Sequence, residues 1–316
     1  MKILVTGAEG FVGSRLVPRL LAAGHEAIAG VHPAVPEPSQ RFAAGGKPIR
    51  IVPLEIGDAA AVGTALAVGV DAVIHLAAVA SGADARSDPP AAWRVNAEGT
   101  ALLAESIAGV REQGDGDPLL LVISTAEVYG TGPRIPRKET DPVSPCSPYG
   151  ASKLGAEIAA LEVHRRAGLR VVIARAFPHT GAGQTERYVV PALAARIRAA
   201  KRAGVNAVSV GNLDVTRELM HVDDVIDAYT LLLERGVSGE TYNVASGEGV
   251  SLQEVFRLLC QIMGHWPRPE VHPSLMRAAD IPYLVGDAAK LRTLTGWKPS
   301  RTLEYTLRDV VHAQTD

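Results

Sequence analysis

The chain has 316 residues, which is enough for one large hydrophobic core or two modest domains. Hydrophobic residues make up 47% of it and charged residues 21%, as in a globular protein. The formal net charge of −2 provides no general attraction to nucleic acid or to an anionic membrane surface, so neither is an expected partner. The two cysteines, Cys146 and Cys260, form neither a CxxC motif nor a disulfide framework.

Metal binding and export from the cell are also not expected. The nine histidines are scattered, and none stands at metal-ligand spacing with another ligand type. No apolar run approaches the length of a membrane span, and the first apolar run begins too early to leave room for a signal peptide. These features predict a cytoplasmic protein without a metal site.

The first thirteen residues predict a buried strand, a tight turn and the start of a helix. In the turn, Gly7 lets the chain change direction, Gly10 leaves room for a pyrophosphate, and Gly13 lets helix and strand pack closely. The N–H groups and the positive end of the helix attract phosphate. A glycine turn can also be purely structural, but its position between a strand and a helix favours a dinucleotide site.

The first half of the chain alternates strands and helices. Further strands are expected at 26–31, 49–54, 72–76, 119–124 and 170–174, and helices at 11–23, 58–67, 91–112 and 149–167. The strands are nearly continuous apolar runs, which is typical of parallel strands covered on both faces. Helical crossovers between them predict an α/β fold with a doubly wound parallel sheet.

After Phe177 the pattern of elements changes. A glycine-rich loop leads to a helix at 189–202, and further elements are expected at 222–234, 241–244, 252–263 and 303–312. We therefore predict a dinucleotide-binding domain over residues 1–177. Residues 178–316 are expected to form mainly a smaller substrate-binding lobe, with some segments returning to the first domain.

The residues that can carry chemistry follow the fifth strand. Ser124 and Thr125 end that strand, and Tyr149 and Lys153 begin the next long helix, where a spacing of four places them on one face. A tyrosine has an ordinary pKa of about 10, and an ammonium one turn away is expected to lower it. Tyr149, Lys153 and Thr125 can then move a proton at an alcohol or ketone while a nicotinamide moves hydride. Tyr-x-x-x-Lys also occurs as an ordinary helix pair, and the glycine turn favours the catalytic interpretation.

Several motifs together resemble the extended short-chain dehydrogenase/reductases, the NAD-dependent epimerase/dehydratase family, over almost the whole chain. The motifs are Gly7-x-x-Gly10-x-x-Gly13, His75-Leu76-Ala77-Ala78, Ser124-Thr125-Ala126-Glu127-Val128-Tyr129-Gly130 and Tyr149-Gly150-Ala151-Ser152-Lys153. Within the family, 175–184, 217–225 and 286–299 are similar to GDP-6-deoxy-4-keto-mannose reductases and GDP-mannose dehydratases. The resemblance implies a Rossmann fold.

The resemblance also implies roles for individual residues. Thr125, Tyr149 and Lys153 would be catalytic. The cofactor would contact Gly7, Gly10, Phe11, Val12, Gly13, His32, Glu55, Ile56, Leu76, Ala77, Ala78, Asn96, Tyr149 and Lys153. The substrate would contact Glu127, Pro178, His179, Arg217, Arg277 and Asp280. Arg217 and Arg277 would bind the substrate diphosphate, and Asp280 the ribose of its nucleotide. Each of these three can instead be structural, with Arg217 in a surface salt bridge.

The choice of cofactor depends on the end of the second strand. Gly30-Val31-His32 lacks the acid that would bind the adenosine 2′-hydroxyl of NAD. Its absence favours NADP, with NAD as the alternative, and His32 and Arg41 are candidates to approach a 2′-phosphate.

The reaction type depends on Ala126, which stands where dehydratases of the family have a polar or acidic residue. The sequence thus favours reduction of the 4-keto group of a nucleotide-linked 4-keto-6-deoxyhexose. GDP is the expected nucleotide, because of the stretch 179–184. A 4,6-dehydratase or 4-epimerase is the alternative, and a non-catalytic NADP(H)-sensing protein a more distant one. By resemblance, a homodimer formed by helices 91–112 and 149–167 is expected.

Overall fold

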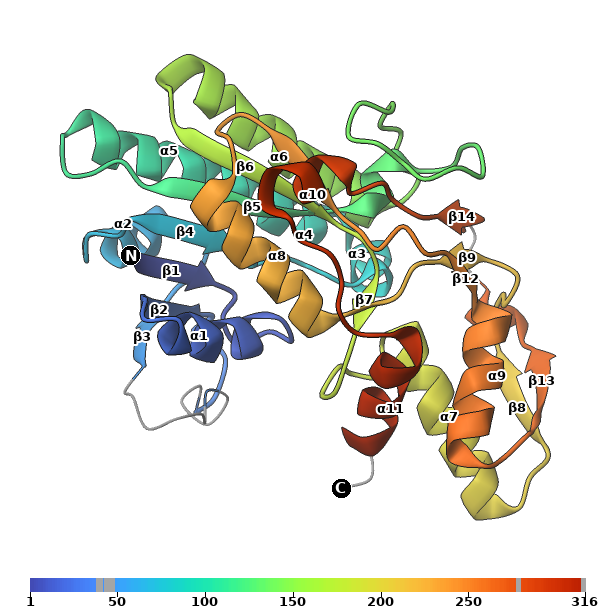
Figure 1. The fold of residues 1–316 in the computed structure, drawn as a ribbon. Coiled ribbons are helices and arrows are strands. Elements are labelled where there is room, and N and C mark those ends of the chain that lie inside the picture. Colours follow the sequence, from blue (N-terminus) through green and yellow to red (C-terminus); the bar gives the residue numbers. More distant parts are fainter. Residues whose placement is uncertain (38–41, 43–48, 277–279, 314–316) are drawn as a thin grey trace.

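Seven parallel strands form the central sheet of this computed structural model, which describes residues 1–37, 42, 49–276 and 280–313 (Figure 1). In spatial order the strands are β3 (Arg50–Pro53), β2 (Glu26–Val31), β1 (Lys2–Thr6), β4 (Ala72–His75), β5 (Leu119–Thr125), β6 (Arg170–Ala176) and β11 (Thr241–Val244). Each neighbouring pair is parallel, so the doubly wound parallel sheet is confirmed. The chain crosses from one side of β1 to the other between β3 and β4.

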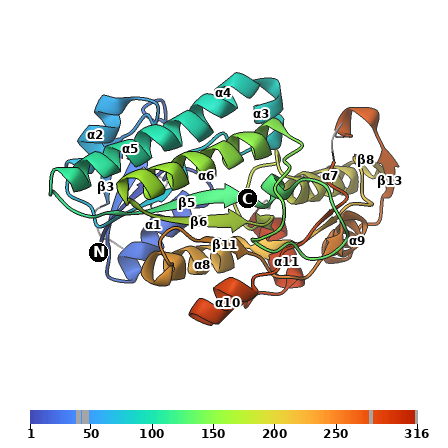
Figure 2. The same ribbon diagram turned by 90° about the horizontal axis from the view of Figure 1, so that it is seen from above.

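Helices cover both faces of the sheet (Figure 2). One face carries α1 (Gly13–Ala22), α8 (Val222–Arg235) and α10 (Ala289–Thr295), and the other carries α2 (Ala59–Leu66), α5 (Gly99–Glu112) and α6 (Pro148–Ala167). Side chains of β1 alternate between the two cores: Ile3 and Val5 belong to the first and Leu4 to the second. This burial on both faces explains why the strands are continuous apolar runs.

The helix starts follow local capping chemistry only in part. Asp58 caps α2 as expected, because its Oδ1 accepts a hydrogen bond of 2.8 Å from the Ala60 N–H. The helix expected at 91–112 is instead α4 (Pro89–Trp93), a π-helical turn (Arg94–Glu98) and α5. Hydrogen bonds from the buried Asn96 to distant parts of the chain hold this wider turn, and the local sequence pattern does not reveal them.

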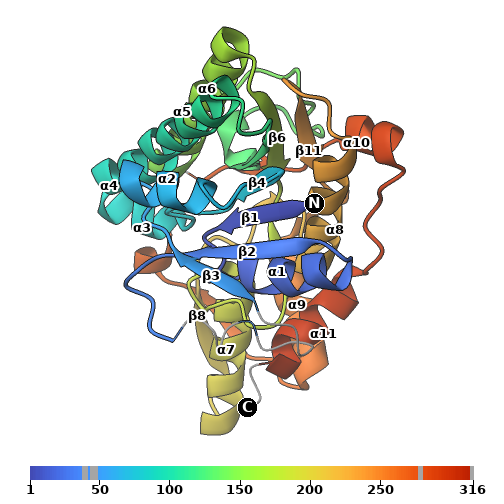
Figure 3. The same ribbon diagram turned by 90° about the vertical axis from the view of Figure 1, so that its left-hand side faces the viewer.

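The second half of the chain both completes the sheet and builds a smaller core. α8 and β11 pack with the first half, whereas α7 (Val189–Ala203), α9 (Leu252–Met263) and α11 (Leu303–Ala313) enclose a separate apolar cluster, seen below the sheet in Figure 3. The remaining elements are α3 (Gly82–Ser87), β7 (His179–Thr180), β8 (Ala207–Val210), β9 (Thr216–Arg217), β10 (Met220–His221), β12 (Val250–Ser251), β13 (Arg268–Val271), β14 (Tyr283–Leu284) and two 3₁₀ turns (Ala126–Tyr129 and Pro273–Leu275). The domain division after residue 177 stays a prediction. None of the helices in the described ranges is both long and apolar enough to cross a membrane.

A buried ion pair joins α6 to the ends of β5 and β6. Arg175 Nη2 lies 2.8 Å from Glu157 Oε2, and the two side chains are 8% and 3% exposed. Ser124 donates a hydrogen bond to the same carboxylate, and Arg175 Nη1 donates to the Tyr129 hydroxyl at 3.0 Å. The network thereby fixes how α6 sits on the carboxyl ends of the strands.

We predict that Glu157→Gln lowers the free energy of unfolding by about 3 kcal/mol, because it leaves the Arg175 guanidinium buried without its counter-charge. Urea denaturation at neutral pH measures the change. The matched control is Glu254→Gln, which removes the charge from an exposed pair with Arg257 on α9 and should leave the transition unchanged. Equal stability of the Glu157→Gln variant and the parent would contradict the prediction.

Candidate active site

A cavity of about 630 Å³ opens at the carboxyl ends of the strands. Its walls include Gly7 after β1, His32 after β2, Leu76 after β4, Thr125 at the end of β5 and Phe177 after β6. The volume is typical of a small-molecule site. The position, beside the point where the strand order reverses, is where open α/β sheets bind their ligands.

Two glycines of the turn in the cavity wall, Gly7 and Gly13, have no room for a side chain. Gly7 has a φ of +63°, and a Cβ there would lie 2.7 Å from the Ala77 backbone nitrogen. A Cβ on Gly13 would lie 2.7 Å from the Ala8 Cα, so the start of α1 packs closely against the turn that follows β1. Gly10 lines the cavity just before α1. The turn therefore suits a ligand that must approach the backbone and a helix N-terminus, as a pyrophosphate does.

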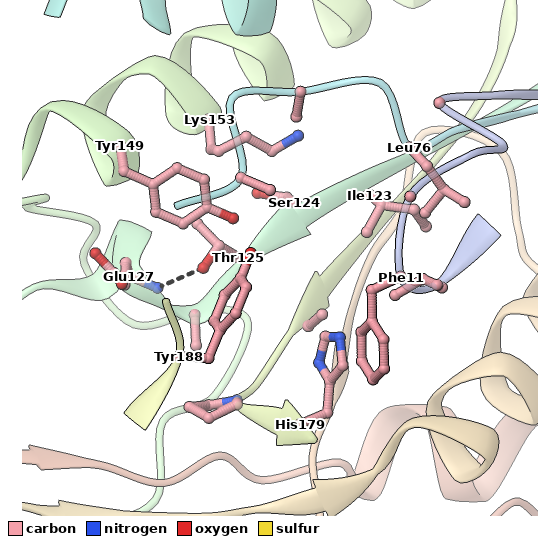
Figure 4. A pocket seen from close by; sticks show the side chains of 18 of the residues that line it. Phe11, Leu76, Ile123, Ser124, Thr125, Glu127, Tyr149, Lys153, His179 and Tyr188 are labelled. Atoms are coloured by element: carbon pink, nitrogen blue, oxygen red, sulfur yellow. Dashed lines mark hydrogen bonds between the residues drawn. The ribbon is translucent and has the colours of Figure 1, made fainter. Parts of the chain in front are cut away.

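Three side chains that the sequence singled out as catalytic candidates meet at one end of the cavity, which we call its reacting end. Tyr149 and Lys153 of α6 and Thr125 of β5 all point into it (Figure 4). The Thr125 hydroxyl hydrogen-bonds Tyr149 and accepts from the Glu127 N–H at 3.2 Å. A carbonyl oxygen placed beside Tyr149 can therefore meet both hydroxyl groups.

The electrostatics of these residues differ from the expectation. Burial raises the pKa of the Tyr149 phenol, the Glu127 charge and Tyr188 raise it further, and the Thr125 hydrogen bond opposes the rise. Burial also lowers the pKa of the Lys153 ammonium to about 8, while the Glu157 carboxylate works against that fall. Desolvation thus outweighs the lowering of the Tyr149 pKa that we expected from Lys153. Tyr149 is a neutral phenol at neutral pH, which is the form that donates a proton.

The opposite end of the cavity lies at the end of β2. His32 Nε2 is 2.6 Å from Glu55 Oε2, so the imidazole contacts a carboxylate, and Ile56 lies next to it in the wall. The backbone N–H of His32 donates a hydrogen bond to Glu9 Oε1 at 3.3 Å. Sequence reasoning missed Glu9, although its place between two glycines of the turn was a usable signal. Arg41 lies outside the described residues.

Buried hydrogen bonds hold the loop after β4. The Thr6 hydroxyl contacts His75 Nδ1 at 2.8 Å and accepts from the Ala77 N–H at 3.1 Å. Burial lowers the pKa of His75 to about 3, so its ring is neutral. With the loop fixed in this way, Leu76, Ala77 and Ala78 line the cavity as expected.

Asn96 is placed differently from its expected role as a cofactor contact. It is fully buried and does not belong to the cavity wall. Its Oδ1 accepts from the Val79 N–H at 2.8 Å, and its Nδ2 donates to the Ser152 hydroxyl at 2.9 Å. Because these bonds occupy the amide, Asn96 holds the loop after β4 against α6.

Most of the residues assigned to the substrate come from the second half of the chain. The wall contains Glu127, Pro178, His179, Arg217 and Asp280. Arg217 Nη2 lies 2.8 Å from Asp280 Oδ1, with the side chains only 11% and 17% exposed, so this ion pair is part of the cavity wall rather than the surface. Arg277 lies outside the described residues.

Two tyrosines of the wall were missed by the sequence analysis. Tyr188, just before α7, directs its hydroxyl toward Thr125 (Figure 4). Tyr229 of α8 also lines the cavity. No motif marks either residue, and Tyr229 has the spacing of an ordinary core position on an amphipathic helix.

In all, every expected site residue of the described ranges lies in the cavity wall, except Asn96.

Comparisons with known proteins show which family the chain belongs to. The model of the NAD dependent epimerase/dehydratase family matches residues 3–245. The chain is 32% identical over 313 residues to GDP-6-deoxy-D-mannose reductase of Pseudomonas aeruginosa, covering 98% of this chain and 96% of that protein.

Solved structures are similar over nearly the whole chain. RMD from Pseudomonas aeruginosa complexed with NADPH gives a TM-score of 0.81 at 31% identity, covering 99% of this chain and 98% of that one. UDP-glucose 4-epimerase of Thermus thermophilus in complex with NAD gives 0.85 at 29% identity, covering 100% and 99%. The family resemblance of the motifs is thus confirmed, and the chain belongs to the NAD-dependent epimerase/dehydratase family.

Proposed function

We propose that this protein reduces the 4-keto group of a nucleotide-linked 4-keto-6-deoxyhexose, GDP-linked, with NADPH, and with NADH as the alternative reductant. The observation that carries the proposal is the neutral, partly buried Tyr149 phenol beside Thr125, a proton donor at the reacting end of the cavity. Ala126 offers no acid for a dehydration step. The similarity to a GDP-6-deoxy-D-mannose reductase supports this substrate class.

NAD(P)H, when bound, supplies the hydride for the carbonyl carbon. The glycine turn and the N-terminus of α1 bind its pyrophosphate, and the Lys153 ammonium binds the nicotinamide ribose. Thr125 donates a hydrogen bond to the carbonyl oxygen, and Tyr149 transfers its phenolic proton to that oxygen, which yields the alcohol. The nearby Lys153 charge stabilises the phenolate that remains.

The second half of the chain binds the rest of the substrate. In this proposal, residues 178–316 form mainly the lobe that closes over it. The guanidinium of Arg217 binds the diphosphate, Asp280 the ribose, and Glu127 the sugar. Arg217 and Asp280 hold each other in position before binding, since their ion pair already lies in the wall.

A 4-epimerase is the second candidate, because the fold similarity to the NAD-bound epimerase is as high as that to the reductase. The two reactions differ in what happens to the cofactor. A reductase consumes one NAD(P)H for each sugar, whereas an epimerase retains its cofactor through the cycle.

We also propose a homodimer formed through the helical segment 91–112, which includes the end of α4 and all of α5, and through α6. Trp93 and Ile158 are 47% and 58% exposed, unusual for large apolar side chains. Trp93 packs against Gly155, where a Cβ would lie 2.8 Å from Trp93 Cζ3, and Ile158 is one turn further along α6. The two side chains therefore form one apolar surface on the helices of the expected interface. The cytoplasmic location stays a prediction.

The proposed reaction predicts that one NADPH is oxidised for each GDP-4-keto-6-deoxy-mannose added. The loss of NADPH absorbance measures the oxidation, and the same assay is repeated with NADH. Tyr149→Phe removes the proton donor and should lower kcat at least about 100-fold. Its affinity for NADPH should stay close to that of the parent, measured by fluorescence titration. Conversion of a GDP-4-keto-sugar without consumption of NAD(P)H would contradict the reductase, as would full activity of Tyr149→Phe.

The lowered pKa of Lys153 predicts how cofactor affinity depends on pH. The ammonium is present below about pH 8 and is lost as the pH rises through that value, so NADH should bind tightly at pH 7 and about tenfold more weakly at pH 9.5. Lys153→Met, which has no charge to lose, should bind weakly at both values. A parent affinity that does not change over this range would contradict the role of Lys153.

The dimer proposal predicts that Ile158→Glu converts the protein to monomers, because it buries a charge in the apolar interface. Sedimentation velocity at micromolar concentration measures the change. The matched control is Val205→Glu, at a 48% exposed valine after α7, which should remain dimeric. A monomeric parent protein would refute the proposal.

A further inference from the structure

The hydroxyl of Tyr229 is buried without a hydrogen-bond partner. The residue is fully buried on α8, and its Oη contacts no donor or acceptor in the described part of the chain. Other buried tyrosines are paired: the Tyr129 hydroxyl donates to Asn243 Oδ1 at 2.7 Å, and the Tyr242 hydroxyl accepts from the Val237 N–H at 3.2 Å. Leaving such a group unpaired costs about 1–3 kcal/mol, so the hydroxyl needs an explanation.

Tyr229 is part of the cavity wall. It lines the cavity from the α8 side of the sheet, opposite the α6 side that carries Tyr149. Burial raises its pKa, and the neighbouring Tyr149 phenol adds to that rise, which indicates that the two phenols lie near each other. The residue thus lines the cavity, while its hydroxyl, which has almost no accessible surface in the protein alone, lacks a partner in the described part of the chain.

The surroundings of Tyr229 indicate which part of a ligand it meets. Phe11, Ile123, Ala176 and Phe177 belong to the same apolar cluster and line the same cavity. A sugar would leave several hydroxyl groups unpaired against such a wall. A planar heterocycle with one polar substituent fits it well, because the ring packs on the apolar side chains and the substituent meets the single hydroxyl.

We propose that Tyr229 binds the nicotinamide ring of the cofactor by donating its hydroxyl hydrogen to the carboxamide oxygen. The inference rests on the proposed NAD(P)H-dependent function, and adds to it a residue that sets the rotation of the ring about its glycosidic bond. By fixing that rotation, Tyr229 determines which face of the nicotinamide ring is turned toward the carbonyl beside Tyr149. The bond also satisfies the hydroxyl that the protein alone leaves unpaired.

The test compares two ligands and two variants. Tyr229→Phe should weaken NADPH binding about tenfold, equal to about 1.4 kcal/mol, and leave the affinity for 2′-phospho-ADP-ribose unchanged, because that ligand lacks the nicotinamide. Without ligand, the Tm of Tyr229→Phe should equal or exceed that of the parent, since the change removes an unpaired group. The matched control is Tyr242→Phe, which loses a paired hydroxyl and should lower the Tm without changing either affinity.

Two results would overturn the inference: an unchanged affinity of Tyr229→Phe for NADPH, or an equal loss for both ligands, which would indicate a general structural role. The parent protein separates this inference from the proposed function. Failure of the parent to bind NADPH and NADH would refute the function itself. If the parent prefers NADH, then NADH and ADP-ribose replace the two phosphorylated ligands in the same comparison.

Discussion

The ion pair between Glu157 and Arg175 is the interaction on which the active site depends most. Glu157 lies one turn after Lys153 and two turns after Tyr149 on the same face of α6. By binding Ser124 of β5 and Arg175 of β6, its carboxylate fixes that face against the strand end that carries Thr125. The same negative charge counteracts the desolvation of Lys153. One buried carboxylate thus contributes to both the geometry and the electrostatics of the site.

Contacts between the two halves of the chain build the cavity around that site. α8 of the second half packs on the same core as α1 and brings Tyr229 to the cavity, while the segment before α7 brings Tyr188. An ion pair of 2.7 Å between Arg187 and Asp84 connects that segment to α3. The wall is therefore apolar on the α8 side of the sheet and polar on the side of Glu127 and Arg217, which matches a flat ring next to a phosphorylated sugar.

The differences between expectation and structure share one origin. Asp58 and the glycine turn were predicted correctly, because capping and backbone space depend on residues a few positions apart. The π-helical turn was not predicted, because Asn96 finds its partners at Val79 and Ser152, far away in the sequence. The pairing of Arg217 with Asp280 likewise joins residues 63 positions apart, so no local pattern reveals it.

The sequence by itself determined the α/β alternation, the glycine turn and the placing of Tyr149 and Lys153 on one helix face, since each is written in short-range spacing that a helix or a strand converts directly into local geometry. Tertiary structure alone decided the protonation of these residues. Tyr149 stays neutral and Lys153 loses part of its basicity because desolvation, to which distant elements contribute, raises the pKa of the first and lowers that of the second. It also decided which buried groups remain unpaired, and the Tyr229 hydroxyl is visible as one of these only once α8 lies against the sheet.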